Sequence, residues 1–475
     1  MNASTPHAQC AAGFARQQAA SRAQPEVPLA LRRDRLRRLQ ALVEQQGSRL
    51  ADAVQADFGV RSHDVTQLTE LLPLQWELRH TLRHLARWMR TRRVPTPLQL
   101  QPAGARLQPQ PLGVVGVVSP WNYPLNLALG PAVAALSAGN RVMLKPSEAT
   151  PHTADCLAAL LAERFDADEL QVVTGDASVA AAFTAQPWDH LLFTGSPGVG
   201  RKVALAAAAQ LVPTTLELGG KSPCLLDTGV DLAVAMPRIV QGKLLNCGQT
   251  CIAPDYVLLP RGQQQAFVQA FGATLQRFYP RIAGNPDYTA LLDAGGLARM
   301  QALLDDARAK GGRVLQFGTA EPVPTDPVRQ RQMPPALVLD TRPDMRVLRE
   351  EIFGPILPLV PYDTLDEAIA FVNARERPLA LYWFGQDAGR TARVLAQTTS
   401  GGVVLNDTLL HFVHSGLPFG GVGQSGWGAY HGEAGFLRLS HLKPVLRQPR
   451  WGVGALVYPP YGDRLRRLLG WMARF

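Results

Sequence analysis

Short apolar segments alternate with segments of helical spacing between positions 112 and 218, and this alternation constrains the fold more than any other feature of the chain. Continuous apolar runs of strand length are typical of parallel sheets that are covered on both faces. Helices between such strands form the crossover connections. The predicted strands are Leu112–Val118, Arg141–Leu144, Leu170–Val173, His190–Phe193 and Thr214–Leu218, and the predicted helices are Pro151–Phe165, Ser178–Ala185 and Val199–Ala208. The pattern predicts a doubly wound parallel sheet.

A second series of the same kind follows from Ser222 to about Gly428. Its predicted helices lie near Leu232–Leu245, Gln263–Phe278 and Met300–Lys310, and its strands near Ala253–Leu259 and Gly401–Leu405. The fold class is therefore predicted to be α/β with two doubly wound domains that meet near Gly219-Gly220. Before the first series, Leu29–Ala56 and Leu71–Met89 have the spacing of amphipathic helices, and Val94–Pro111 reads as an extended segment.

Length and composition exclude several classes of protein. The chain has 475 residues, which at roughly 100 to 200 residues per domain corresponds to two to four domains. No apolar run approaches the ~20 residues that span a bilayer, and the first residues lack a signal-peptide pattern, so we expect a cytoplasmic protein. The five cysteines are odd in number and lack paired metal-ligand spacing. We therefore expect reduced thiols and no metal site.

The charge of +10 raises the question of nucleic acid as a partner. However, 42 of the 48 basic residues are arginines, and many of them lie among the predicted amphipathic helices. Arginine on solvated helix faces explains this composition, and the sequence contains no zinc-finger spacing or aromatic RNA-binding signature. We therefore expect no nucleic-acid partner.

Three segments carry candidate catalytic side chains. The loop Asn246–Cys251 follows a predicted helix, where exposed amide groups can lower a thiol pKa, although an isolated cysteine is more often a small buried apolar residue. Glu217 lies between apolar residues at a strand end, which suits a general base, or it pairs with Lys221 or an arginine. Asn122 follows the first core strand and either points into the crevice above the sheet or belongs to a simple turn.

Two further segments indicate a nucleotide-binding site. Phe193–Gly200 is a glycine-rich turn between a strand and a helix, where backbone amides can bind phosphate, but its spacing is not that of the GxGxxG fingerprint. Lys145 and Glu148 also follow a strand and offer a cation and a carboxylate for ribose hydroxyls.

Together these segments resemble motifs of the aldehyde dehydrogenase superfamily. PWNYP, KPSE, FTGSPGVG, LELGGKSP, GQTCIAPDY, EEIFGP and LPFGGVGQSGWGAYHG occur in the family's order and approximate spacing, over roughly Leu29 to Lys443. Seven ordered motifs are much more specific than any one of them. APDY and YHG resemble the class 3 branch of the family. Within that branch, DHLLFTGS, RPLALYWFG and Pro459–Gly462 are most similar to coniferyl aldehyde dehydrogenases.

The resemblance implies a role for each matching residue. It makes Cys251 the nucleophile, Glu217 the general base and Asn122 a donor to the oxyanion. It assigns the cofactor, NAD with NADP possible, to Lys145 and Glu148 at the adenosine ribose, to Gly195, Ser196 and Gly200 near the pyrophosphate, and to Trp121, Glu351 and Phe353. A carboxylate at position 148 would bond a free 2′-hydroxyl and repel a 2′-phosphate, so we expect NAD over NADP.

The resemblance also implies a domain plan. Residues 1–93 and 111–219 would form the NAD(P)-binding domain, and 220–430 the catalytic domain. Residues 94–110 and 431–452, with a strand over Phe436–Arg447, would form a bridging and oligomerisation arm of a homodimer. Residues 453–475 would form an amphipathic tail, which places Leu465, Leu468, Leu469, Met472 and Phe475 on one helical face. Such a tail packs on its own protein or contacts an anionic membrane surface.

The expected reaction is oxidation of a hydrophobic, aromatic aldehyde of the coniferyl type to its acid through a thiohemiacetal and a thioester on the cysteine. Two alternatives are a long-chain aliphatic aldehyde dehydrogenase and a catalytically silent scaffold of the same fold. Glu217 favours water over coenzyme A as the acyl acceptor. The sequence leaves open whether Tyr123, His411, Phe412 and Phe419 line a substrate tunnel or belong to the core, and whether Cys247 is a packing residue or forms a regulatory disulfide with Cys251.

Overall fold

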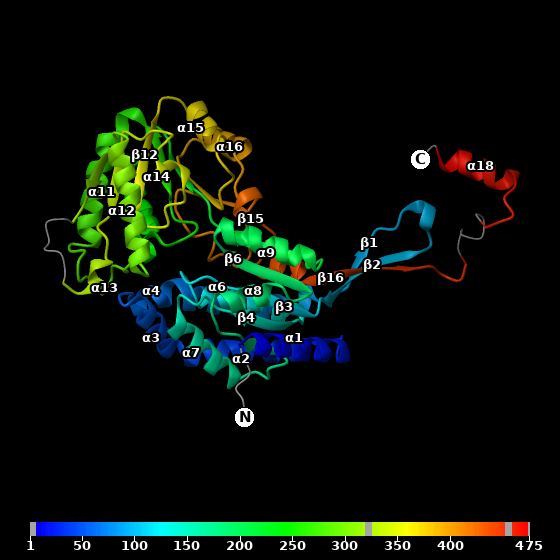
Figure 1. Cartoon of the computed structure of the whole chain (residues 1–475). Coiled ribbons are helices and arrows are strands. Elements are labelled where there is room, and N and C mark those ends of the chain that lie inside the picture. Colours follow the sequence, from blue (N-terminus) through cyan, green and yellow to red (C-terminus); the bar gives the residue numbers. More distant parts are fainter. Residues whose placement is uncertain (1–5, 319–324, 452–457, 474–475) are drawn as a thin grey trace.

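The computed structural model of the chain describes residues 6–318, 325–451 and 458–473. It consists of two α/β units and a thin β arm that projects from the first unit (Figure 1). This arrangement confirms the predicted fold class. Of the residues predicted to form the arm and the tail, 452–457 and 474–475, Phe475 among them, lie outside the described residues, and so do the side chains of Leu468, Trp471 and Met472.

The first unit is built on a six-stranded sheet in the order β15-β7-β6-β3-β4-β5. All its neighbouring strands are parallel except β15, which is antiparallel to β7 and places Gly426 opposite Glu217. The strands are β3 (Val114–Val118), β4 (Arg141–Lys145), β5 (Leu170–Val172), β6 (His190–Gly195), β7 (Thr214–Leu218) and β15 (Gly426–Trp427). The five strands predicted for this sheet are thereby confirmed. β15 lies within the range 220–430 but pairs with the first sheet.

Alternating side chains of β3 supply two separate cores. Val115 and Val117 belong to the core on one face of the sheet, and Val114 and Val118 to the core on the other, as the two-residue period of a strand requires. α6 (Asn126–Ala138) and α7 (Pro151–Ala162) cover the first face, and α1 (Pro6–Ala23), α8 (Ala177–Thr184) and α9 (Pro197–Ala209) cover the second. Behind α6 lie α2 (Leu29–Gln45), α3 (Gly47–Phe58), α4 (His63–Thr66), α5 (Leu72–Trp88) and the π-helical turn η1 (Gln67–Leu71).

The second unit contains a seven-stranded sheet in the order β10-β11-β12-β9-β8-β13-β14, in which only β10 is antiparallel to its neighbour. Its strands are β8 (Pro223–Leu226), β9 (Tyr256–Pro260), β10 (Arg313–Gln316), β11 (Ala336–Leu339), β12 (Ile356–Tyr362), β13 (Ala380–Phe384) and β14 (Gly402–Leu405). Its helices are α10 (Leu232–Leu244), α11 (Gln264–Phe278), α12 (Ala294–Ala309), α13 (Pro327–Gln330), α14 (Arg346–Arg349), α15 (Leu365–Asn373) and α16 (Ala388–Gln397). The predicted strand near Ala253–Leu259 begins three residues later than expected, and the predicted helix at Met300 is the second half of α12.

The arm is a three-stranded antiparallel sheet in the order β1-β2-β16. β1 is Arg92–Val94, β2 is Gly104–Pro111 and β16 is Ser440–Arg447. The strand predicted from Phe436 was wrong over its first part, because α17 (Gly432–Arg438) buries Phe436 against Trp88 at a ring distance of 5.9 Å.

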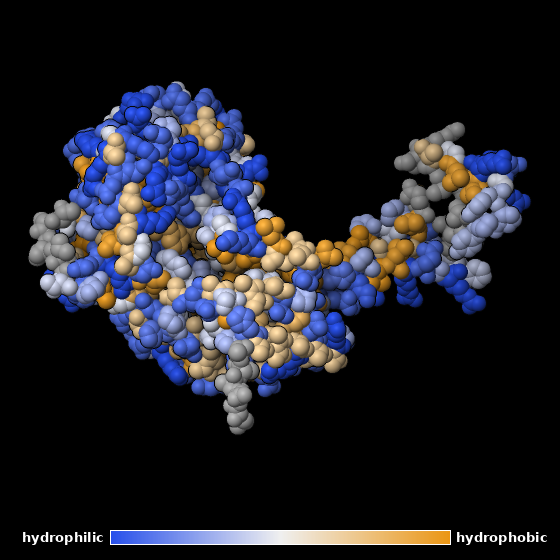
Figure 2. Space-filling model, viewed as in Figure 1, coloured by the Kyte–Doolittle hydropathy of each residue, from blue (hydrophilic) through white to orange (hydrophobic). Residues whose placement is uncertain are grey.

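Apolar side chains gather on the surface of the arm (Figure 2), among them Val94, Leu98, Leu100 and Leu446, which are all exposed. α18 (Asp463–Met472) lies beyond the arm and away from both α/β units (Figure 1). Within the described residues, no helix is both long enough and apolar enough to cross a membrane.

Candidate active site

A cavity of about 580 Å³ opens at the carboxyl ends of β3 and β6. The chain leaves β3 toward β4 and leaves β6 toward β7, in opposite directions across the sheet, so these two ends form a topological switch point, where α/β sheets bind ligands. The segments that follow both strands line this cavity, and so do Glu217, Cys251 and Glu351.

A second cavity of about 570 Å³ approaches the same place from the other side. Its lining is mainly apolar and includes Trp76, Tyr123, Phe412 and Ile252. Cys251 lines both cavities. The thiol is therefore positioned where two ligands, one from each cavity, can meet.

Backbone geometry and buried hydrogen bonds hold the loop that carries this thiol. Asn246 and Cys247 have φ values of 52° and 56°, which turn the chain sharply after α10. The carbonyl oxygen of Asn122 accepts hydrogen bonds from Arg61 Nη1 at 2.8 Å and from Asn246 Nδ2 at 3.0 Å. Asn122 Nδ2 donates to the carbonyl oxygen of Gln249 at 3.0 Å. These bonds fix the Asn122 segment to the Cys251 loop.

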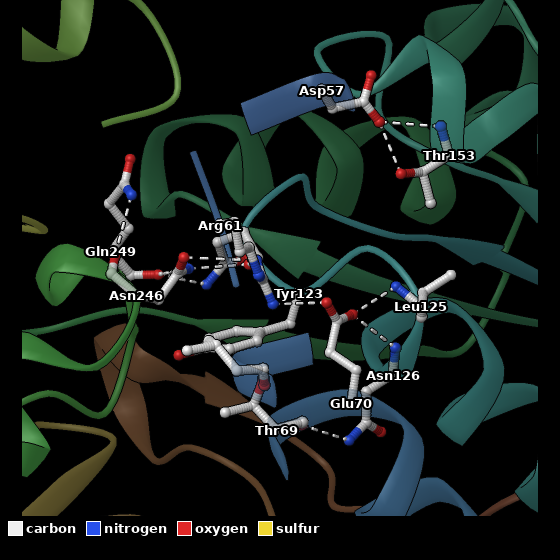
Figure 3. A network of polar contacts seen from close by, with 12 residues as sticks. Asp57, Arg61, Thr69, Glu70, Tyr123, Leu125, Asn126, Thr153, Asn246 and Gln249 are labelled. Carbon is white, nitrogen blue, oxygen red and sulfur yellow. Dashed lines mark hydrogen bonds and ion pairs between the residues drawn. The ribbon is translucent and has the colours of Figure 1, made fainter. Parts of the chain in front are cut away.

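A buried ion pair supports the network from behind. Arg61 Nη2 lies 2.6 Å from Glu70 Oε1, and both side chains have no exposed surface. Glu70 Oε2 also accepts the backbone N–H groups of Leu125 and Asn126 at 2.7 and 3.2 Å (Figure 3). The pair thus connects η1 to the start of α6 and to the site.

We expect Arg61→Met to lower the free energy of unfolding by about 3–5 kcal/mol, because it leaves the Glu70 carboxylate buried without its cation. Denaturant unfolding measures the change. The matched control is Arg261→Met, which removes an ion pair of similar length to Asp363 whose side chains are 61% and 55% exposed. That change should cost less than about 1 kcal/mol. Equal losses in the two variants would contradict the structural role of Arg61.

Glu217 extends from β7 into the first cavity and is fully buried. Among the described residues, neither of its carboxylate oxygens has a hydrogen-bond partner. Burial raises the pKa of this carboxyl well above its usual value. Lys221, its possible partner from the sequence, instead pairs with Asp255 and donates to the carbonyl oxygen of Val347 at 2.8 Å. Glu217 therefore remains available to a ligand or to water.

The thiol of Cys251 is half-buried, and burial together with the carboxyls of Glu351 and Glu217 raises its pKa to about 12. The backbone N–H groups of Cys251 and Ile252 act in the opposite direction and lower the pKa. Asn122 is 3% exposed and is among the residues that line the first cavity, and its Nδ2 carries a second proton besides the one donated to Gln249. If the sulfur adds to a carbonyl carbon, the resulting oxyanion can accept hydrogen bonds from this amide and from the backbone N–H groups.

These pKa values predict the pH profile. A thiol can act as a nucleophile, and a carboxyl as a base, only after it loses its proton, and the pKa values of the Cys251 thiol and the Glu217 carboxyl are both raised. The active protonation state therefore becomes more populated as pH rises. We expect kcat to increase between about pH 6 and about pH 9, by at most about tenfold per unit for each group. A profile that is flat or falls over this range would contradict the assignment.

The predicted cofactor residues occupy different positions around the first cavity. Its lining contains Trp121, Gly195, Ser196, Glu351 and Phe353. Lys145 and Glu148 lie beside it, next to Ala149 of the lining, with 3.6 Å between Lys145 Nζ and the Glu148 carboxylate. Gly200 is not part of the lining: a Cβ there would lie 2.6 Å from the side chain of Leu218. Its function is close packing of α9 on β7.

The cavity fits a polar dinucleotide. Unpartnered buried oxygen atoms face it from Glu217, Thr194 and Glu351. Burial, with the charge of Asp255, raises the pKa of Glu351 to about 8. The N-terminus of α9, capped by Ser196, begins at the cavity and can bind phosphate through its backbone amides. These groups can supply the hydrogen bonds that hydroxyl and phosphate groups need.

Sequence reasoning missed Arg61, Glu70, Gln249 and Arg299. The guanidinium of Arg299 donates to the backbone oxygens of Glu351 and Ile352, and Gln249 Oε1 accepts the N–H of Leu292 at 2.9 Å. One signal was present in the sequence: the acid Glu70 directly precedes Leu71 and Leu72 in a mostly apolar stretch.

Three side chains named in the sequence analysis are not among the described residues that line either cavity, namely His411, Phe419 and Cys247. Tyr123 and Phe412 line the apolar cavity, whereas His411 and Phe419 are not among the described residues that line it. Their rings lie 5.8 Å apart, and the Phe419 ring packs edge to face on Phe412 at a ring distance of 4.9 Å. Cys247 is fully buried, and its sulfur lies 3.7 Å from the hydroxyl of Tyr288. This placement favours a packing role for Cys247.

Comparisons with known proteins agree with this geometry. The family model described as "Aldehyde dehydrogenase family" matches residues 3–445. A probable coniferyl aldehyde dehydrogenase of Pseudomonas aeruginosa is 48% identical over 456 residues, which cover 96% of this chain and 94% of that protein. Aldehyde dehydrogenase family 3 member A2 of Mus musculus is 40% identical over 439 residues, with coverages of 92% and 88%.

Solved structures of aldehyde dehydrogenases also match this chain over most of its length. AldH of Staphylococcus aureus in its substrate-bound state matches with a TM-score of 0.90 and 34% identity, over 97% of this chain and 99% of that one. An aldehyde dehydrogenase of Mycobacterium tuberculosis complexed with NAD+ matches with a TM-score of 0.83 and 28% identity, with coverages of 93% and 90%.

Proposed function

This chain belongs to the aldehyde dehydrogenase family, and from that premise we propose that it oxidises a hydrophobic, aromatic aldehyde of the coniferyl type to the carboxylic acid. It is an NAD(P)-dependent aldehyde dehydrogenase. The observation that carries the proposal is the position of Cys251, which lines both the polar cavity and the mainly apolar one. The apolar lining, with Trp76, Tyr123 and Phe412, suits an aromatic substrate.

The site residues have complementary roles in this reaction. The Cys251 thiolate attacks the carbonyl carbon to form a thiohemiacetal, and the Asn122 amide and the Cys251 N–H stabilise its oxyanion, at typically about 3 kcal/mol per donor. When bound, the dinucleotide supplies the oxidant that accepts the aldehyde hydrogen with its electron pair. Glu217 then takes a proton from water, which attacks the remaining thioester and releases the acid and the thiol.

A panel of aldehydes tests the substrate class. NADH formation is measured with aliphatic, benzylic and cinnamyl aldehydes at matched concentrations, and kcat/KM should be highest for the cinnamyl group. Higher efficiency with long aliphatic aldehydes would favour the alternative of a long-chain aldehyde dehydrogenase. A silent scaffold would form no NADH with any of them. Against that second alternative, Cys251, Glu217 and Asn122 all line the same cavity.

Cofactor preference forms a separate proposal, NAD over NADP, which rests on the half-exposed carboxylate of Glu148. We expect Glu148→Gln to raise the ratio of NADP to NAD efficiency about tenfold, the equivalent of about 1.4 kcal/mol of like-charge repulsion. Glutamine keeps a hydrogen-bonding group for the ribose, so kcat/KM with NAD should fall less than in Glu148→Ala. Equal efficiencies of the wild-type enzyme with NAD and NADP would contradict the preference.

The arm supports a further part of the proposal, a homodimer. Leu98 is 78% exposed and Leu446 is 57% exposed, which is costly in a monomer. In such a dimer α18 would pack on the second copy of the same protein rather than on a membrane. Light scattering should give twice the chain mass, and liposome flotation of the full chain should match that of a chain ending at Gly462. A monomer, or flotation that depends on the tail, would overturn this part.

A further inference from the structure

One wall of the apolar cavity carries a polar strip, which consists of Arg238 and Gln241. Pro237, Arg238, Gln241 and Leu245 line the cavity from one face of α10 and its end. At 1.5 Å of rise per residue, Gln241 lies about 6 Å and Arg238 about 10 Å before Leu245 along the helix. α10 ends where the loop of Cys251 begins, so the strip leads away from the thiol. The 41% exposure of the Arg238 side chain places it at the mouth of the cavity.

Most other polar side chains of this lining already have partners inside the protein. Thr69 Oγ1 donates to the carbonyl oxygen of Val65 at 2.7 Å. The hydroxyls of Tyr123 and Thr250 bond one another at 2.6 Å. Thr408 Oγ1 donates to the carbonyl oxygen of Arg238 at 2.9 Å. Each of these hydroxyl groups therefore already has a partner inside the protein.

The strip differs from them because two of its donor groups are free. In the part of the chain that the structure describes, the Gln241 amide has no side-chain hydrogen bond, and Arg238 Nη2 has no hydrogen-bond partner. Arg238 Nη1 donates to the carbonyl oxygen of Asn406, and Nε lies 3.7 Å from the Asp407 carboxylate. Asp407 offsets the charge of Arg238, so this end of the cavity offers donors without an excess of positive charge.

We propose that Gln241 and Arg238 select aldehydes that carry a neutral oxygen substituent, a phenolic hydroxyl or a methoxy group, at the end opposite the carbonyl. This selection rests on the proposed function, because it extends an aromatic substrate from Cys251 to the mouth of the cavity. Free N–H donors bind oxygen acceptors. A substrate carboxylate at the same place would be repelled by the negative charge of Asp407, so the site favours a neutral oxygen.

The test compares coniferyl aldehyde, which has both oxygen substituents, with unsubstituted cinnamaldehyde. For the wild type, kcat/KM should be higher with coniferyl aldehyde. Gln241→Leu should lower the ratio of the two efficiencies about fivefold, the effect of one lost neutral hydrogen bond. Arg238→Met should lower it about tenfold, because bonds from a charged donor are stronger. The loss should appear in KM for coniferyl aldehyde, while kcat for cinnamaldehyde stays near its wild-type value.

Thr69→Val is the matched control, because it removes a hydroxyl from the same cavity that is already bonded to Val65. The ratio of efficiencies should not change in this variant. If Gln241→Leu and Arg238→Met keep the wild-type ratio while cinnamaldehyde is still oxidised, the selection is overturned and the proposed function stands. If the wild type oxidises neither aromatic aldehyde, the proposed function itself fails.

Discussion

Cys251→Ala should lower kcat/KM by about 10⁴-fold or more, because the aldehyde then has no nucleophile with which to form a covalent intermediate. The loss should appear with every aldehyde that the wild type oxidises. Binding of NAD, followed by the change in protein fluorescence, should persist, since the lining of the first cavity comes from many other residues. NADH formation measures the activity.

Cys247→Ala is the matched control for this prediction. Cys247 is also a cysteine of the same loop, but it is fully buried against Tyr288 and lines neither cavity among the described residues. This variant should keep most of the wild-type activity. Similar losses in the two variants would mean that the loop, rather than the Cys251 thiol, limits the reaction.

Glu217→Gln should lower steady-state turnover by about 10²–10⁴-fold, the usual contribution of a general base. In the proposed reaction, formation of the thioester does not require this carboxyl, whereas hydrolysis of the thioester does. The first turnover should therefore remain, and stopped-flow absorbance should show a burst of NADH close to one per active site. After the burst, release of the acid should be slow.

The burst distinguishes the chemical role of Glu217 from a structural one. Glutamine has nearly the same shape as glutamate, and no hydrogen bond to the Glu217 oxygens exists among the described residues that the change could break. Loss of the burst together with turnover would indicate that Glu217 acts before the thioester forms. It would then contradict the role of water-activating base.

Regular sequence patterns were sufficient to predict much of the fold. The strands of the first sheet are short apolar runs bounded by turn residues, and β7 was placed at Thr214–Leu218, where the structure has it. α6 was missed because all its thirteen residues are buried, so it has no polar face and no amphipathic period. Phe436 was assigned to a strand because local pattern alone does not reveal that it packs on Trp88.

The candidate site was predictable to a different extent. Cys251, Glu217 and Asn122 were identified through ordered motifs, and the structure brings all three to one cavity. Arg61 and Glu70 could not be identified in this way, since their importance lies in a buried contact with Asn122 and α6. The free donors of the strip on α10 were also out of reach, because hydrogen-bond satisfaction depends on tertiary contacts that one sequence does not contain.

The central claim is that the acyl group passes through Cys251 and leaves by the action of Glu217. Mass spectrometry of Glu217→Gln after mixing with NAD and cinnamaldehyde tests it most directly. The tryptic peptide of residues 244–261 contains both loop cysteines, so the experiment uses a Cys247→Ala background. A cinnamoyl group should be found on Cys251 in an amount equal to the NADH burst. A full burst with no acyl group on this peptide, or an acyl group on another residue, would contradict it.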